Sequence, residues 1–158
     1  MKSKLLIAIA LLTVANSAAA DCIEGAARHF GTDADVLRAI AIVESRVRPQ
    51  AVRANLDGST DRGLFQINSI HLPELARAGV GPADLHDVCL SSHVAALLLK
   101  RKMVRFGNNW TAVGAYHSTK PAKRDVYSAK VRAVYEGIQK MRNAERTPVV
   151  ASAFAFLE

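Results

Sequence analysis

The stretch of sequence that decides the fold runs over residues 33–68 and reads DADVLRAIAIVESRVRPQAVRANLDGSTDRGLFQIN. In its first part, Leu37 and Ile40 recur at a spacing that places side chains on one face of an α-helix. The acidic residues at its start suit a first helical turn, where the helix dipole favours negative charge. We therefore expect a helix from about Asp33 to Arg46, with Thr32 as its N-cap.

Glu44 needs an explanation because it shares the apolar face of this helix. It follows Leu37, Ile40 and Ala41 at the spacings that bring side chains together on a helix. A carboxylate there costs free energy unless it is paired or protonated, and desolvation raises a carboxyl pKa. Such a group could serve as a catalytic acid. From spacing alone, the alternative is a glutamate at the helix edge that bonds Ser45, an arginine or the backbone.

The second part of the stretch changes character. Polar and turn-forming residues crowd positions 55–60, and Asp57-Gly58 is a strong turn signal. A short apolar run follows at residues 64–67. We interpret this part as a small, irregular β-hairpin or lobe inserted between helices.

Helical patterns also occur on both sides of this stretch. Further helices are expected at Cys22–Phe30, Ile70–Ala78, Leu90–Phe106, Trp110–Tyr116 and Asp125–Met141. The predicted fold class is therefore α+β and mostly α-helical. Residues 143–158 contain Pro148 and no sustained period, so we expect a loosely ordered C-terminal tail.

The N-terminal segment has the pattern of a secretory signal peptide. Lys2 and Lys4 precede an apolar run over residues 5–14, and small residues follow at 18–20. We predict that residues 1–20 form the signal peptide and that residues 21–142 form one domain. The alternative is an uncleaved membrane anchor, but the apolar run is shorter than the roughly 20 residues that a spanning helix needs. No later segment is long and apolar enough to span a membrane, so we predict a periplasmic location.

Charge and cysteine content narrow the partners and the compartment. Removal of residues 1–20 takes away two of the 21 basic residues and none of the 14 acidic ones, which leaves a net charge of +5. A basic exported protein fits a polyanionic cell wall better than nucleic acid. Cys22 and Cys89 favour a disulfide in an oxidising compartment, and two buried free thiols are the alternative. No clustered cysteines or histidines indicate a metal site.

Three motifs occur in order along the chain. The pair Glu44-Ser45 comes first, the GLFQIN segment at residues 63–68 follows, and Ala115-Tyr116 comes later. This order and spacing resemble those of the lytic transglycosylases, goose-lysozyme-like enzymes of the soluble lytic transglycosylase family. The resemblance covers roughly residues 22–135 and implies a lysozyme-like fold with a small β-hairpin lobe. Within the family, the chain most resembles small accessory enzymes that open the cell wall for type III or type IV secretion, conjugation or pilus systems.

The resemblance also implies a reaction. Glu44 would protonate the oxygen that bridges N-acetylmuramic acid and N-acetylglucosamine in the glycan strands of peptidoglycan. As a carboxylate, it would then take the proton of the muramic C6 hydroxyl, which closes onto C1 to give a 1,6-anhydro sugar. Acid–base chemistry on a glycoside needs no cofactor.

The substrate-binding residues implied by the resemblance lie next to the same motifs. They are Ser45, Phe65, Gln66, Asn68, Tyr116 and His117. Two have open alternatives: Phe65 could pack in the core, and Tyr116 could be a core aromatic with its hydroxyl on a carbonyl. Phe65 stands where many members have methionine. His117 stands where many have asparagine, so its role in this chain is open, and the alternative is a partly exposed loop histidine.

Asp61 is a candidate for a second catalytic carboxylate. It lies on the expected β lobe, and animal-type lysozymes resemble this layout, with a glutamate ending a helix and an aspartate on a facing hairpin. Our hypothesis is that Asp61 assists by electrostatics, and the alternative is a turn residue that bonds its own backbone. A hydrolytic muramidase that uses Glu44 with Asp61 is a competing interpretation. A wall-binding assembly protein without catalysis is another.

Overall fold

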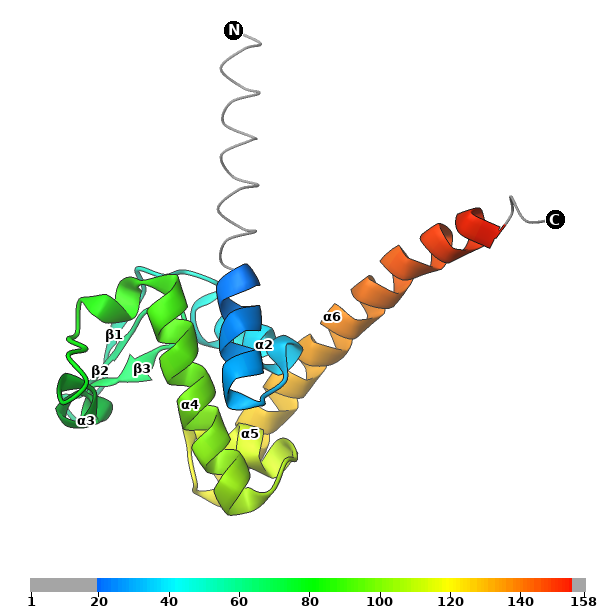
Figure 1. Ribbon diagram of the computed structural model, residues 1–158. Helices are drawn as coiled ribbons and strands as arrows, with labels where there is room; N and C mark the ends of the chain where they lie inside the picture. The colour runs from blue at the N-terminus through cyan, green and yellow to red at the C-terminus, as the bar shows by residue number, and fades with distance from the viewer. Residues whose placement is uncertain (1–19, 155–158) are drawn as a thin grey trace, which may run out of the picture.

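The computed structural model describes residues 20–154, with side chains up to residue 145. A helix over residues 20–30 comes first, and the further elements are α2 (Ala34–Ser45), β1 (Val52–Ala54), β2 (Thr60–Arg62), β3 (Ile67–Asn68), the 3₁₀ turn η1 (Ser69–His71), α3 (Leu72–Ala76), η2 (Asp84–His86), α4 (Val88–Phe106), α5 (Trp110–His117) and α6 (Pro121–Phe154). The predicted α+β, mostly helical class is confirmed. The strands lie on one side of α4, and α2, α5 and α6 lie on the other (Figure 1). The signal peptide predicted at residues 1–20 falls, apart from its last residue, outside the described residues.

Helix α2 begins one residue later than expected. Asp33 is its N-cap, and its carboxylate accepts from the backbone N–H groups of Asp35 and Val36 at 2.7 and 3.2 Å. The prediction of Thr32 as the cap was therefore wrong, because a carboxylate one residue later reaches the same free N–H groups. At the other end, Arg46 adopts a left-handed backbone with φ 55° and closes the helix. This end places Glu44 in the last turn of α2.

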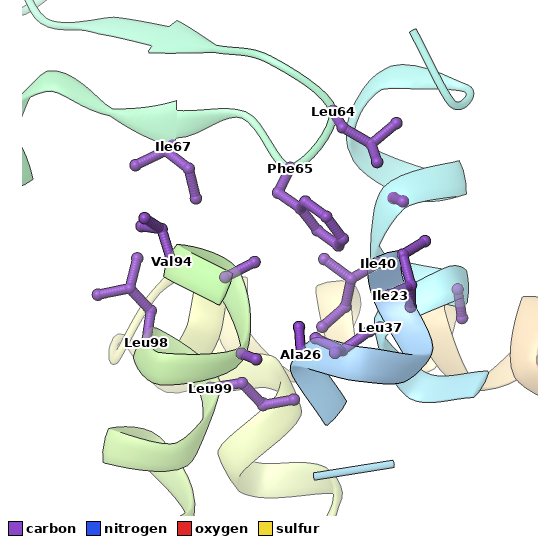
Figure 2. Packing of buried hydrophobic residues seen from close by; sticks show 14 of the residues in the cluster. Ile23, Ala26, Leu37, Ile40, Leu64, Phe65, Ile67, Val94, Leu98 and Leu99 are labelled. Carbon is purple, nitrogen blue, oxygen red and sulfur yellow. The ribbon is translucent and has the colours of Figure 1, made fainter. Parts of the chain in front are cut away.

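The hydrophobic core lies between α2, α4 and the turn that precedes β3. Leu37, Ile40 and Phe65 have no exposed surface. Figure 2 shows Phe65 reaching from the turn toward α2, with Ile67 facing Val94 of α4. Burial of each large apolar side chain contributes about 1.5–3 kcal/mol. The core therefore fixes the turn before β3 against the end of the helix that carries Glu44.

The β lobe is a three-stranded antiparallel sheet in the order β1-β2-β3. The lobe was predicted, but its third strand was not. Its register pairs Arg53 with Asp61, and Asp61 with Asn68. Residues paired in this way have side chains on the same face of a sheet. The sheet therefore sets three polar side chains in a row.

Gly63 lets the lobe approach the rest of the domain. Its φ is +75°, and a Cβ atom added there would lie 1.9 Å from the carbonyl oxygen of Leu85. Its own N–H donates to the Ala51 carbonyl at 2.8 Å. No other residue type fits this combination of left-handed backbone and close approach.

Helix α6 is longer than predicted. It runs from Pro121 to Phe154 (Figure 1), so the expected bounds of Asp125 and Met141 were wrong at both ends. Pro148 lies inside it, although proline removes a backbone donor from a helix interior. The C-terminal end was predicted wrongly because the sequence contains Pro148, which is typical of a helix end, but no strong cap that marks where the helix ends. The boundary between the domain and residues 143–158 stays a prediction.

One polar link joins α6 to α2, and one disulfide joins the helix over residues 20–30 to α4. The buried Asp35 of α2 accepts from Gln139 at 2.7 Å and pairs with Arg142 at 3.1 Å, both on α6. The predicted disulfide is present and joins Cys22 to Cys89 at the start of α4, with a Cα–Cα distance of 4.7 Å. A loop of this length contributes about 4 kcal/mol to stability in the chain-entropy model.

Within residues 20–154, no helix combines the length and hydropathy that a membrane span requires.

We expect Gly63→Ala to destabilise the protein far more than Gly58→Ala. Both glycines have left-handed backbones, but a Cβ at Gly58 would meet no atom within 4 Å. Gly58→Ala should cost about 1 kcal/mol from backbone strain alone, whereas Gly63→Ala should cost about 2–4 kcal/mol because overpacking adds to it. Urea unfolding of both variants measures the difference. Equal losses would show that the contact with Leu85 relaxes freely.

Candidate active site

Glu44 lines a cleft of about 570 Å³ between the end of α2, the sheet and the end of α5. The structure brings five of the predicted site residues to this cleft beside Glu44: Asp61, Gln66, Asn68, Tyr116 and His117. Arg53 and Lys123 also line the cleft, although no sequence pattern predicted either residue there. The cleft therefore combines a carboxyl group at its helical wall with a charged, polar sheet opposite.

Burial raises the pKa of the Glu44 carboxyl above its ordinary value. A hydrogen bond from Tyr127 and the positive charge of Arg53 act in the opposite direction, and the negative charge of Asp61 raises the pKa further. The net direction is upward. Glu44 therefore retains its proton at a higher pH than an exposed glutamate does.

Tyr127 of α6 holds the Glu44 side chain. Its hydroxyl donates to Glu44 Oε1 at 2.7 Å, and the residue is 6% exposed. Burial and the neighbouring Glu44 carboxylate hold the pKa of Tyr127 well above its ordinary value, so it remains a donor. The His117 ring stacks on the Tyr127 ring with centroids 4.9 Å apart and an interplanar angle of 10°.

Only a weak sequence signal pointed to Tyr127 as a site residue. Tyr127 belongs to the apolar face of the last expected helix, where a tyrosine is interpreted as a residue of the hydrophobic core. Its distance from Glu44 along the chain gave no reason to pair the two. A buried tyrosine needs a partner for its hydroxyl, and that requirement was the one available clue.

Tyr116 lines the cleft near Glu44, and its role in substrate binding stays a prediction. Its hydroxyl donates to the carbonyl oxygen of Phe65 at 3.2 Å, which is the alternative left open from the sequence. Tyr116 lines the cleft and feels the charge of Glu44, which raises its pKa after the larger effect of burial. Tyr127 holds the Glu44 carboxyl instead, because α6 lies against the end of α2. The sequence does not show this proximity.

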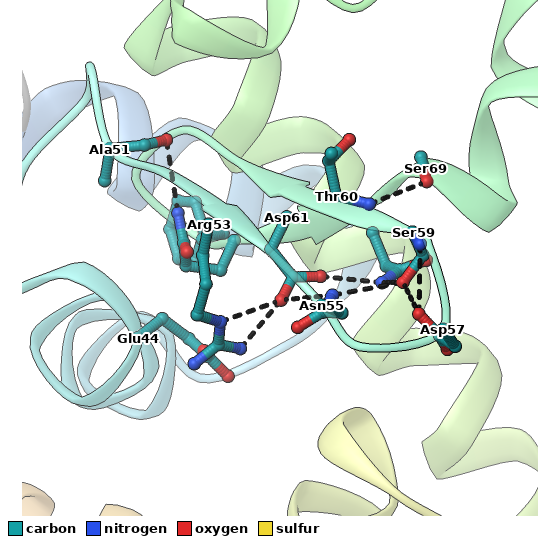
Figure 3. A network of polar contacts seen from close by, with 12 residues as sticks. Glu44, Ala51, Arg53, Asn55, Asp57, Ser59, Thr60, Asp61 and Ser69 are labelled. Atoms are coloured by element: carbon teal, nitrogen blue, oxygen red, sulfur yellow. Dashed lines mark hydrogen bonds and ion pairs between the residues drawn. The ribbon is translucent and has the colours of Figure 1, made fainter.

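Asp61 is 5% exposed and is held by side chains of the sheet and its turn (Figure 3). Oδ2 accepts from Arg53 Nε and Nη2 at 3.1 and 2.7 Å and from Asn55 Nδ2 at 3.1 Å. Oδ1 accepts from Asn68 Nδ2 at 2.7 Å. The alternative that Asp61 bonds its own backbone was therefore wrong. Asp57 does so instead, accepting from the N–H of Ser59 at 3.0 Å.

Ser45 and Phe65 are buried away from the cleft, which corrects their prediction as substrate-binding side chains. Ser45 is 2% exposed, and its hydroxyl donates to the Leu64 carbonyl at 2.7 Å and accepts from the Arg48 N–H at 3.0 Å. Phe65 is fully buried in the core. Both residues join α2 to the turn that leads into β3.

Gln66 and Asn68 lie at the cleft, but their amide groups already have partners. Gln66 Nε2 donates to the carbonyls of Gly63 and Ala51 at 3.0 and 3.3 Å, and its φ is +48°. Asn68 Oδ1 accepts from the Ile70 N–H at 2.9 Å. Both residues shape the turn, and Gln66 retains a carbonyl oxygen that could accept from a ligand.

The arrangement suits acid–base chemistry. One carboxyl group is partly desolvated and hydrogen-bonded, so that it can give and later take a proton. The facing carboxylate is ionic and fixed. Lys123 and Arg53 add positive charge to the rim. Within the described residues, no group of three or more histidine, cysteine, aspartate or glutamate side chains could hold a metal ion.

Comparison with known proteins finds one domain family that matches most of the chain. A family model described as the transglycosylase SLT domain matches residues 21–135. The chain is 39% identical over 139 residues to "Invasion protein IagB" of Salmonella typhimurium, which covers 87% of this chain and 86% of that protein. It is 37% identical over 133 residues to "Protein IpgF" of Shigella flexneri, with 78% and 88% covered. It is also 35% identical over 131 residues to "X polypeptide" of Escherichia coli, with 78% of each chain covered.

We predict that Tyr127→Phe raises the pKa of Glu44, because it removes a hydrogen bond that favours the carboxylate. The carboxyl ¹³C chemical shift of Glu44, followed against pH by NMR, measures this directly. Tyr116→Phe is the matched control, since its hydroxyl bonds the Phe65 carbonyl. Equal shifts in both variants would contradict a specific role for Tyr127.

Proposed function

Because the chain belongs to the transglycosylase SLT domain family, and is thus a peptidoglycan lytic transglycosylase, we propose that it cleaves the β-1,4 bond between N-acetylmuramic acid and N-acetylglucosamine. The muramic product would end in a 1,6-anhydro ring. The observation that carries this proposal is the desolvated Glu44 carboxyl, held in the cleft by the Tyr127 hydroxyl.

Glu44 acts first as an acid and then as a base. Its proton passes to the bridging oxygen as the bond to muramic C1 breaks, and the electron pair leaves with that oxygen. The resulting Glu44 carboxylate takes the proton of the C6 hydroxyl, whose oxygen then bonds C1. No water is consumed, and Glu44 regains its proton. The raised pKa supports the first step, and the Tyr127 hydrogen bond supports the second because it favours the carboxylate.

Asp61 assists this reaction by its charge. Positive charge that develops at C1 would be stabilised by a carboxylate on the facing sheet. Attack on C1 is less suited to Asp61, because four donor contacts from Arg53, Asn55 and Asn68 occupy both of its oxygens. A hydrolytic muramidase is the second candidate function. The observation that favours it is the placement of both carboxylates on opposite walls of one cleft.

The enzyme is proposed to act in the periplasm after export through a signal peptide at residues 1–20. Its peptidoglycan substrate supports this location. We further propose that it opens the wall locally for a secretion or conjugation apparatus. Support comes from the motif resemblance, from the small size of the chain and from a relative that carries the name "Invasion protein".

Glu44→Gln should lower product formation from purified peptidoglycan by about 10²- to 10⁴-fold, because glutamine cannot supply a proton. Mass spectrometry of the soluble products identifies their ends. Muropeptides with 1,6-anhydromuramic ends support the proposed reaction. Hydrated reducing ends would instead establish the muramidase. Glu74→Gln, an exposed glutamate paired with Arg101, is the control for general loss of charge.

Asp61→Asn should slow the reaction by roughly 10- to 100-fold without changing the product, because it removes charge but not the acid. Asp125→Asn, an exposed aspartate outside the cleft, is the control for loss of one negative charge. Urea unfolding of both variants separates catalysis from folding. Turnover equal to that of Asp125→Asn, in a folded Asp61→Asn protein, would leave Asp61 with a structural role only.

A further inference from the structure

A second hollow lies at the opposite ends of α2 and α5 from the catalytic cleft. It has a volume of about 430 Å³. Asp33, the N-cap of α2, and Trp110, the first residue of α5, line it, whereas Glu44 and His117 lie at the other ends of the same helices. A helical rise of about 1.5 Å per residue separates Asp33 from Glu44 by roughly 16 Å. The proposed reaction uses none of the residues that line this hollow.

Two aromatic rings form one part of its wall. Trp110 and Tyr135 meet edge to face, with centroids 5.5 Å apart and an interplanar angle of 71°. The Arg132 guanidinium lies over the Trp110 ring at 5.3 Å, and Arg132 does not line the hollow. The cation therefore supports the indole from outside. Aromatic walls with a few polar groups are typical of sites for small molecules.

Polar side chains also line the hollow. Asp33 and Asn108 are both exposed there. Asn108 precedes Asn109, the N-cap of α5, so its amide offers a donor and an acceptor at the start of that helix.

We propose that this hollow binds an N-acetylated hexosamine of a glycan strand, a proposal that rests on the peptidoglycan substrate of the proposed function. Aromatic rings pack against the C–H face of a sugar, while Asp33 and Asn108 offer partners for its hydroxyl and amide groups. The Asp33 carboxylate disfavours an anionic ligand. The volume lies in the lower part of the range of about 300–1,000 Å³ for small-molecule sites, which suits one or two sugar rings. The enzyme would thus hold its polymeric substrate at a second point, away from the reacting bond.

The chain has one tryptophan, and it lies in this hollow and not in the cleft. Intrinsic tryptophan fluorescence therefore reports on the second site directly. We expect a saturable fluorescence change when the Glu44→Gln protein, which leaves the ligand uncut, is titrated with the tetramer of N-acetylglucosamine.

Asn108→Ala tests the polar part of the wall, because it removes an exposed amide that lines the hollow. Its dissociation constant for the tetramer should rise by roughly 2- to 10-fold, the effect of one hydrogen bond. Thr119→Ala is the control, since Thr119 is exposed and does not line the hollow. Both variants are made in the Glu44→Gln protein.

Two results would overturn the proposal. One is the absence of a fluorescence change at concentrations where the tetramer inhibits peptidoglycan cleavage by the wild-type protein. The other is a change with equal dissociation constants in Asn108→Ala and Thr119→Ala, which would place the ligand elsewhere. The readout does not depend on catalysis, so failure of the proposed function would appear separately, as missing anhydro products with tetramer binding intact.

Discussion

The hydrogen bond from Ser45 to the carbonyl oxygen of Leu64 joins the two halves of the cleft. It is 2.7 Å long and buried, and it ties the last turn of α2 to the turn that leads into β3. Gly63 permits this contact because its lack of a side chain lets the lobe lie against Leu85. Phe65 then fills the core behind it. These contacts fix the lobe relative to the helix, so the position of every group in the cleft follows from them.

The end of α2 gives Glu44 two properties that acid–base chemistry requires. Burial raises its pKa, and the hydrogen bond from Tyr127 limits that rise and fixes the carboxyl. Tyr127 reaches it from α6, which the buried Asp35 fastens to α2 further along. A structural ion pair near one end of α2 therefore supports the geometry of the catalytic group near the other end.

The opposite wall follows a different principle. Asp61 remains in the sheet as a charged group because Arg53, Asn55 and Asn68 surround it, and such complete pairing is what lets a carboxylate stay buried. The cleft thus has one group that can exchange a proton and one that holds a fixed charge. The second hollow adds an aromatic, polar surface at the far ends of α2 and α5. Under the proposed function, the two surfaces would contact a glycan strand at two separate points.

The sequence by itself determined the helical face that carries Glu44, the turn-rich β lobe, the cysteine pair and the motif family, because each depends on local spacing or on composition. It misassigned the cap of α2, the ends of α6 and the binding role given to the buried Ser45 and Phe65 side chains. It gave no sign that Arg53 pairs with Asp61. Only the tertiary structure decided that Tyr127, far along the chain, holds Glu44. Hydrogen bonds between distant segments depend on how helices pack, and periodicity records which face is buried but not which partner it meets.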